Sequence, residues 1–116
     1  MDLSYLSKIE RRVDETIYQA KETGIDLAQV YPKNSLGYKL QEELDSVGRD
    51  LNLGFSGETW DEEIYARIDN CLDKIIHVSD NRLFTVTLLR KNMLKKRHEK
   101  GIELKEAIDY LSGLQP

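Results

Sequence analysis

The sequence predicts an all-α protein, a compact bundle of four to five helices, mainly antiparallel, that forms one domain over residues 1–116. Apolar residues recur every three or four positions along most of the chain, which is the period of an amphipathic helix. Only two prolines interrupt the 116 residues. A single domain of this length buries roughly 65% of its unfolded surface, which is enough to fold without disulfides or a metal.

The first predicted helix begins beside Asp2 or Ser4 and ends at Gly24. Asp and Ser side chains accept hydrogen bonds from the free amides of a helix start, and glycine adopts the left-handed conformation that ends many helices. The apolar side chains along its buried face are Leu3, Leu6, Ile9, Val13, Ile17 and Ala20.

Asn34 or Ser35 is predicted to open a second helix, shortly after Pro32. Gly37 and Gly48 each weaken this helix by about 1 kcal/mol relative to alanine, unless a neighbouring helix packs close to them. Its apolar stripe consists of Leu40, Leu44, Val47 and Leu51, with Leu36 at the start. Such a stripe suits a helical homodimer as well as a monomeric core, so the oligomeric state is open.

The third predicted helix starts at a capping box of Thr59 with Glu62, after a loop at residues 54–57. In a capping box each side chain satisfies a backbone amide near the other residue. The helix is expected to end near His77, and its apolar residues are Trp60, Ile64, Ile68, Leu72 and Ile75.

A fourth segment is predicted to begin with Ser79 or Asp80 as its cap. Residues 83–88 alternate and are rich in β-branched residues, as in a strand, but we expect a helix because a lone strand would leave its backbone groups unsatisfied. Gly101 is predicted to interrupt this helix. The residues that support a fifth helix after it are Ile102, Leu104, Ala107, Ile108 and Leu111.

The residue pattern contains no motif for catalysis or for holding a cofactor. A zinc site needs about four Cys or His ligands, or three and a water, and the chain has only Cys71, His77 and His98. It has no Gly-rich phosphate loop and no Gly-x-Ser-x-Gly motif. We therefore expect no catalytic residues, no cofactor, no metal site and no enzymatic activity.

The single cysteine and the N-terminal segment favour the cytoplasm. Cys71 cannot form a disulfide within the chain, and its simplest role is that of a small buried hydrophobic residue. The first residues lack the apolar run of a signal peptide, and no stretch is long and apolar enough to predict a membrane span.

Charge is strongly polarised along the chain. Residues 82–100 hold seven of the 17 basic residues and one acid, a net charge of +6, whereas the whole chain has a net charge of −4. In a helix at about 100° per residue, Arg90 and Arg97 fall on the buried side. The preceding helix, if antiparallel, places Asp61 opposite Arg97 and Ile68 opposite Arg90. Part of the charge is therefore expected to be neutralised inside this hairpin.

The remaining charged groups predict a surface for another protein. We expect an adaptor, an inhibitor of the immunity type, or a regulatory subunit, including accessory proteins of phages or mobile elements, that docks through the charged hairpin. The predicted partner-binding residues are Lys91, Lys95, Lys96, His98, Glu62, Asp69, Asp73, Trp60 and Tyr65. The alternative is nucleic-acid binding by the basic helix 90–100, which the acidic total and the pI of about 5.2 oppose.

Overall fold

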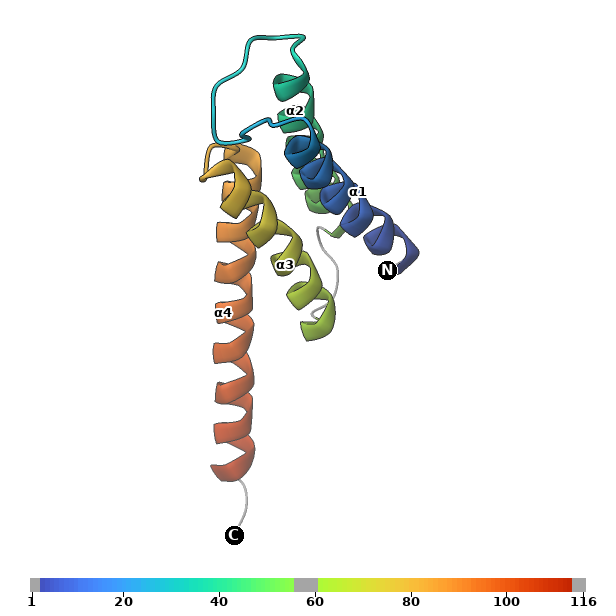
Figure 1. Ribbon diagram of the computed structural model, residues 1–116. Helices are drawn as coiled ribbons and strands as arrows, with labels where there is room; N and C mark the ends of the chain where they lie inside the picture. The colour runs from blue at the N-terminus through green and yellow to red at the C-terminus, as the bar shows by residue number, and fades with distance from the viewer. Residues whose placement is uncertain (1–2, 56–60, 114–116) are drawn as a thin grey trace.

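The computed structural model describes residues 3–55 and 61–113, and these form four helices. They are α1 (Leu3–Glu22), α2 (Leu36–Phe55), α3 (Glu62–Ser79) and α4 (Phe84–Gly113). Figure 1 shows α1, α2 and α3 packed together as a body, with α4 running along this body and continuing well beyond it. The predicted all-α bundle of four to five helices is confirmed. Its outline is elongated, 67 × 26 × 20 Å, because of the length of α4.

The core lies where the apolar stripes of the helices meet. Fully or almost fully buried side chains come from every helix, including Leu6 of α1, Leu44 of α2, Leu72 of α3 and Val86 of α4. The α2 stripe is part of this core, because no member of Leu40, Leu44, Val47 and Leu51 exposes more than 6% of its surface. This stripe is therefore covered within one chain, and the sequence-based reason for a homodimer through α2 no longer holds.

The ends of α1 and α2 follow the predicted signals. Gly24 follows α1 with a φ of 69°, in the left-handed region that favours glycine. The Ser35 hydroxyl accepts a hydrogen bond from the Tyr38 amide at 3.2 Å and so caps the start of α2. A neighbouring helix packs close to Gly48, and this helix is α4. A Cβ on Gly48 would lie 2.9 Å from Cγ2 of Val86.

The passage from α2 to α3 differs from the prediction. Gly54 was expected in a loop but belongs to α2, with the ring of Tyr5 packed so close that a Cβ on this glycine would lie 2.9 Å away. The helix start predicted at Thr59 is wrong, because α3 begins at Glu62. Asp61 caps it by accepting hydrogen bonds from the amides of Glu63 and Ile64. Thr59 and Trp60 lie outside the described residues.

The turn between α3 and α4 also corrects two predictions. Ser79 and Asp80 were expected to open α4, but Ser79 is the last residue of α3 and Asp80 is its C-cap. Asp80 and Asn81 have positive φ angles of 50° and 61°, which turn the chain tightly. Residues 84–88 form the first turns of α4 and not a strand. The Leu83 carbonyl accepts the hydrogen bond of the Thr87 amide at 3.0 Å.

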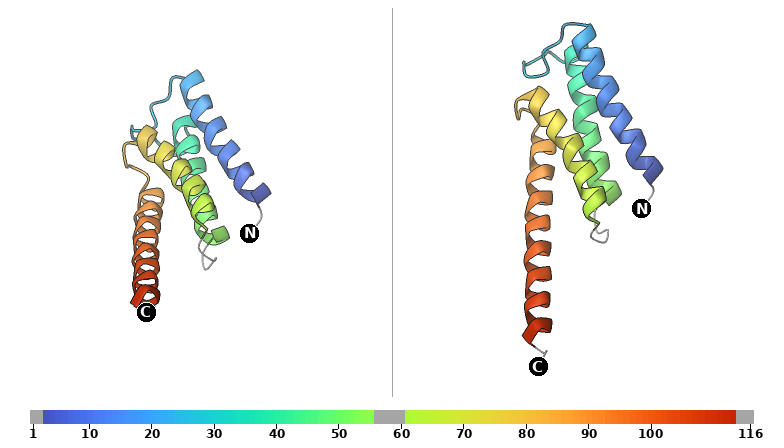
Figure 2. Two further views of the ribbon diagram at one scale, coloured as in Figure 1. Left: turned by 90° about the horizontal axis from the view of Figure 1, so that it is seen from below. Right: turned by 60° about the horizontal axis from the view of Figure 1, so that its bottom comes forward.

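The predicted break at Gly101 is wrong, and so is the separate fifth helix. α4 passes through Gly101 as one continuous helix of 30 residues, which both views in Figure 2 show. A single glycine weakens a helix by about 1 kcal/mol but does not end it. No proline or second glycine accompanies Gly101 to form a turn. Residues 101–113 of α4 are called the arm below, and every arm side chain described is exposed.

None of the four described helices combines the length and the apolar character that crossing a membrane requires.

Candidate partner-binding surface

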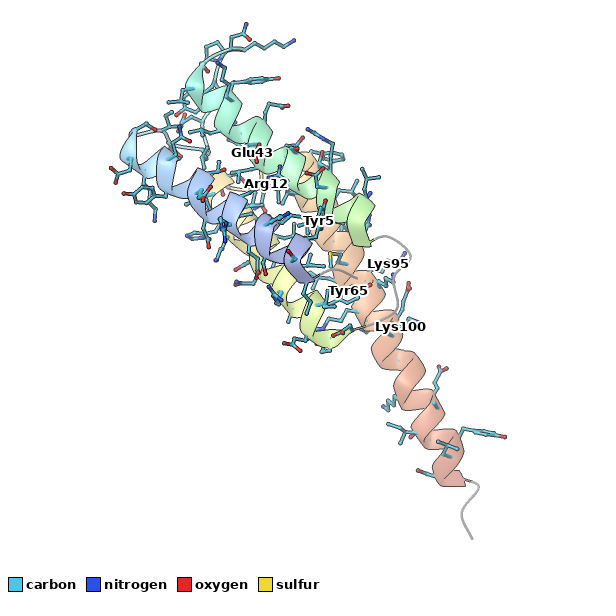
Figure 3. All side chains as sticks on the ribbon, turned by 90° about the vertical axis from the view of Figure 1, so that its right-hand side faces the viewer. Tyr5, Arg12, Glu43, Tyr65, Lys95 and Lys100 are labelled. Carbon is cyan, nitrogen blue, oxygen red and sulfur yellow. The ribbon has the colours of Figure 1, made fainter. Side chains whose placement is uncertain are left out.

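Several charged side chains of the body form ion pairs that join one helix to another. Arg12 of α1 donates from Nε to Glu43 and from Nη1 to Asp50 of α2, each at 2.7 Å, and Figure 3 shows the first pair between the two helices. Burial lowers the pKa of Arg12, but the hydrogen bonds that Arg12 donates to these two carboxylates, together with their negative charge, outweigh burial and leave the pKa raised. Arg67 of α3 similarly pairs with Glu10 of α1. These ion pairs join α1 to α2 and α1 to α3.

Ion pairs also join α3 to α4, and charge within this hairpin is partly neutralised, as predicted. Arg90 binds Asp69 through Nε at 3.2 Å and Asp73 through Nη2 at 3.1 Å, and Arg97 pairs with Glu62. The predicted alignment is wrong by one residue, because Glu62 and Asp69 face the arginines in place of Asp61 and Ile68. The longer α3 and the later turn at residues 80–83 account for this shift.

This alignment changes the role of three predicted partner-binding residues. Glu62, Asp69 and Asp73 were predicted to bind a partner through the charged hairpin. Each of them is instead engaged by an arginine of α4. They are partly exposed, but they already neutralise charge within the hairpin.

Two lysines and a histidine of the predicted surface remain available to a partner. Lys91, Lys95 and His98 are exposed, and none forms an ion pair or hydrogen bond with another described residue. At about 100° per residue they occupy one sector of α4, roughly 60° wide and centred about 110° from Arg90. We call these three residues the basic face. It is smaller than the predicted surface because the three predicted acids are paired with arginines of α4.

Lys96 and Tyr65 are brought together, but at the contact between α3 and α4. The Lys96 ammonium lies 5.9 Å from the centre of the Tyr65 ring, within the range of a cation–π interaction. Tyr65 exposes only 8% of its surface, so it belongs to the packed interior of the hairpin. Trp60, the other predicted aromatic contact, lies outside the described residues.

The exposed apolar side chains of the arm were not predicted from the sequence. Ile108, Tyr110 and Leu111 expose 61%, 69% and 60% of their surface, although Ile108 and Leu111 were assigned to a fifth helix of a compact bundle. The signal that could have identified the arm is the lack of turn residues after Gly101. Without a turn, these residues must continue α4 away from the body.

Cys71 is buried, as predicted, with 2% of its surface exposed. Burial raises the pKa of its thiol to about 11. A thiol of this kind stays protonated near neutral pH and acts as a small apolar side chain. Within residues 3–55 and 61–113, no group of three or more His, Cys, Asp or Glu side chains is placed to hold a metal ion.

Comparisons of the chain with protein-family models, with curated proteins and with solved structures find no match. Function is therefore inferred from the basic face and the arm themselves.

Proposed function

We propose that this protein is a protein–protein interaction module, of the adaptor, inhibitor or regulatory-subunit type, that docks on an acidic surface of a larger protein through the basic face of α4. One observation supports this most strongly. Arg90 and Arg97 are neutralised by α3, whereas Lys91, Lys95 and His98 on the same helix have no acidic partner among the described residues.

The arrangement has the physical properties of a docking surface. The ion pairs of Arg90 and Arg97 fix α4 on α3, so the cations are presented from a rigid element. Exposed charges of this kind contribute little to the stability of the fold. They orient an oppositely charged partner and raise its association rate.

Capture from a lysate of the native host, using the tagged chain as bait, tests the proposal. The test variant Lys91→Glu/Lys95→Glu reverses two charges of the basic face. The control variant Lys33→Glu/Lys39→Glu makes the same charge change on two exposed lysines at the other end of the molecule. We expect the wild type and the control to recover the same partner and the test variant to lose it. Equal recovery by the test variant would refute docking through the basic face.

A second candidate is nucleic-acid binding through the same cations. The observation that favours it is that Lys91 and Lys95 are unpaired and lie in the same stretch of α4 as Lys96 and Lys100, which point to another side of the helix. The net charge of −4 and the neighbouring Glu99 oppose it.

A mobility shift with DNA and with RNA separates the two candidates. Binding through these lysines would give a shift at low salt that weakens steeply as salt is added. Lys91→Glu/Lys95→Glu would remove that shift, and the Lys33→Glu/Lys39→Glu control would keep it. Absence of any shift at low salt would exclude the nucleic-acid candidate and leave the protein partner.

A further inference from the structure

The basic face belongs to a longer stripe of exposed side chains on the outer side of α4. Steps of four, three, four, three and four residues connect its members, which we call the outer stripe: Phe84, Leu88, Lys91, Lys95, His98 and Ile102. At about 100° per residue all six fall within a sector of about 80°. Arg90, Arg97 and Val86, through which α4 contacts α3 and α2, lie about 120–160° from the middle of this sector. The outer stripe therefore faces away from the body.

Exposed apolar side chains occupy both ends of the outer stripe, and the basic face lies between them. Phe84 exposes 75% of its surface and Leu88 exposes 44%, on the N-terminal side of the basic face. Ile102, the first apolar residue of the arm, exposes 45% on the other side. In protein interfaces a few apolar anchors supply most of the affinity, and charges orient the partner. The outer stripe offers both kinds of group on one line.

A groove between α2 and α4 enlarges the apolar end at Leu88. Its volume is about 270 Å³, and its apolar walls are Leu53 of α2 with Leu88 and Leu89 of α4. Leu53 exposes 78% of its surface. Arg49 also lines the groove, but it binds Asp45 of its own helix at 2.7 Å. The groove therefore suits an apolar side chain of a partner.

Charge complementarity identifies the middle of the occupant. Lys91 and Lys95 are four residues apart and have no acidic partner among the described residues, so acidic side chains at a matching spacing would neutralise them. Past Ile102 the same sector of α4 carries Glu106 and Asp109, which repel further acids. The surface for an acidic partner thus ends near Ile102. From Phe84 it extends about 27 Å, or about five helical turns.

The surrounding structure favours a helical occupant. The described residues 3–55 and 61–113 form helices and their connections, so they present no sheet edge to which an extended segment could add as a strand. A helix satisfies its own backbone hydrogen bonds, and its side chains match a straight stripe whose members are three and four residues apart.

We infer that the outer stripe binds one amphipathic α-helix of the partner protein, about five turns long, with acidic residues in the middle of its docking side and apolar residues at both ends. The acids face Lys91 and Lys95, and an apolar side chain at one end enters the groove beside Leu88. This inference rests on the proposed function, because it describes the segment of the partner that docks on the basic face.

Calorimetric titration of the purified chain with the captured partner tests the apolar ends. Phe84→Ser/Leu88→Ser should weaken binding about tenfold or more, since it removes two apolar anchors and leaves the lysines in place. The control Val30→Ser/Leu36→Ser changes two side chains of similar exposure, 81% and 41%, and should bind like the wild type.

The same titration separates this inference from the proposed function. Undiminished binding by Phe84→Ser/Leu88→Ser would overturn the inference and leave docking on the lysines intact. Undiminished binding by Lys91→Glu/Lys95→Glu, or a capture that yields no partner, would overturn both.

Cross-linking in the complex tests the helical occupant on a chain that keeps its lysines. A photoreactive benzoylphenylalanine in place of Phe84 reports the apolar end, and a carbodiimide joins Lys91 or Lys95 to carboxylates of the partner. Phe84 and Lys91 are seven residues apart. We expect both cross-links on one partner segment, about seven residues apart, with apolar and acidic residues at helical spacing. Cross-links to two separate segments, or to none, would overturn the inference.

Discussion

Four arginines hold helices together in this molecule, whereas the lysines of the basic face do not. Arg12, Arg67, Arg90 and Arg97 each bind a carboxylate on another helix, and Arg12 and Arg90 each bind two. A planar guanidinium presents several donors in a fixed fork, which suits two acceptors at once, whereas a lysine ammonium acts as a point charge. The arginines therefore join helices, and the lysines of the basic face stay in solvent.

Replacing Arg90 with lysine tests this distinction at one residue. Arg90→Lys keeps the charge but loses the fork that reaches Asp69 and Asp73, so we expect a stability loss of about 0.5–1 kcal/mol in urea unfolding. The estimate is kept low because these side chains are partly exposed. Arg11→Lys is the control, on an exposed arginine of α1. Equal stability of the wild type and both variants would show that the fork contributes nothing.

Cys71 gives a prediction about reactivity and pH. Its pKa is raised to about 11 by burial, so the reactive thiolate is scarce near neutral pH and increases only as pH approaches that value. We expect alkylation of the folded chain to be far slower than that of a free thiol at pH 7–9, and to become fast when urea unfolds the protein. Rapid alkylation without unfolding would contradict the buried position of Cys71.

At this scale the sequence predicted part of the site. The burial of Cys71 and the intramolecular pairing of Arg90 and Arg97 follow from residue type and helical angle. The ion pairs of Glu62 and Asp69 could not be predicted in this way. A shift of one residue in the α3–α4 alignment is enough to turn an outward-facing acid into an ion-pair partner. Helical periodicity does not fix that alignment; the turn at residues 80–83 does.

At the scale of the elements, two glycines show that helix packing decides how a glycine affects the stability of the fold. Gly48 lies where α2 meets α4, and an added Cβ would be 2.9 Å from Cγ2 of Val86. Gly101 lies in the arm, where an added Cβ would have no neighbour within 4 Å. The two residues have the same intrinsic effect on a helix but different surroundings.

Alanine at these two positions should therefore have opposite effects. Gly48→Ala gains helix propensity but forces α4 away from α2, for a net destabilisation of about 1–2 kcal/mol. Gly101→Ala should increase the helical circular dichroism signal and leave the stability of the body unchanged or slightly higher. Chemical denaturation followed by circular dichroism measures both. Stabilisation by Gly48→Ala would mean that α4 does not pack closely on α2.

The helices were predictable from the sequence, but several of their ends were not. The apolar spacing identified all four helices, and Gly24 and Ser35 marked ends correctly. The errors at Ser79, Asp80 and Gly101 share a cause. Polar residues and glycines are compatible with several positions at a helix end, and the positive φ of Asp80 is a property of the folded turn.

At the scale of the whole molecule, the elongated outline follows from the mismatch between α4 and the body. α4 has 30 residues, whereas α1, α2 and α3 have 18 to 20, so about a third of α4 extends past its neighbours. The spacing of apolar residues in the arm would be the same whether the helix packed on its own chain or on a different molecule. The sequence therefore predicted a helix there but not an exposed one.

The division of α4 into a paired side and an unpaired basic face is the basis of the proposed function. Hydrogen–deuterium exchange, on the free chain and on the complex recovered by capture, locates the partner most directly. We predict that amides around Lys91, Lys95 and His98 exchange several-fold more slowly in the complex, while those of α1 are unchanged. Protection confined to α1 and α2, with α4 unaffected, would contradict the proposal that the partner docks on the basic face.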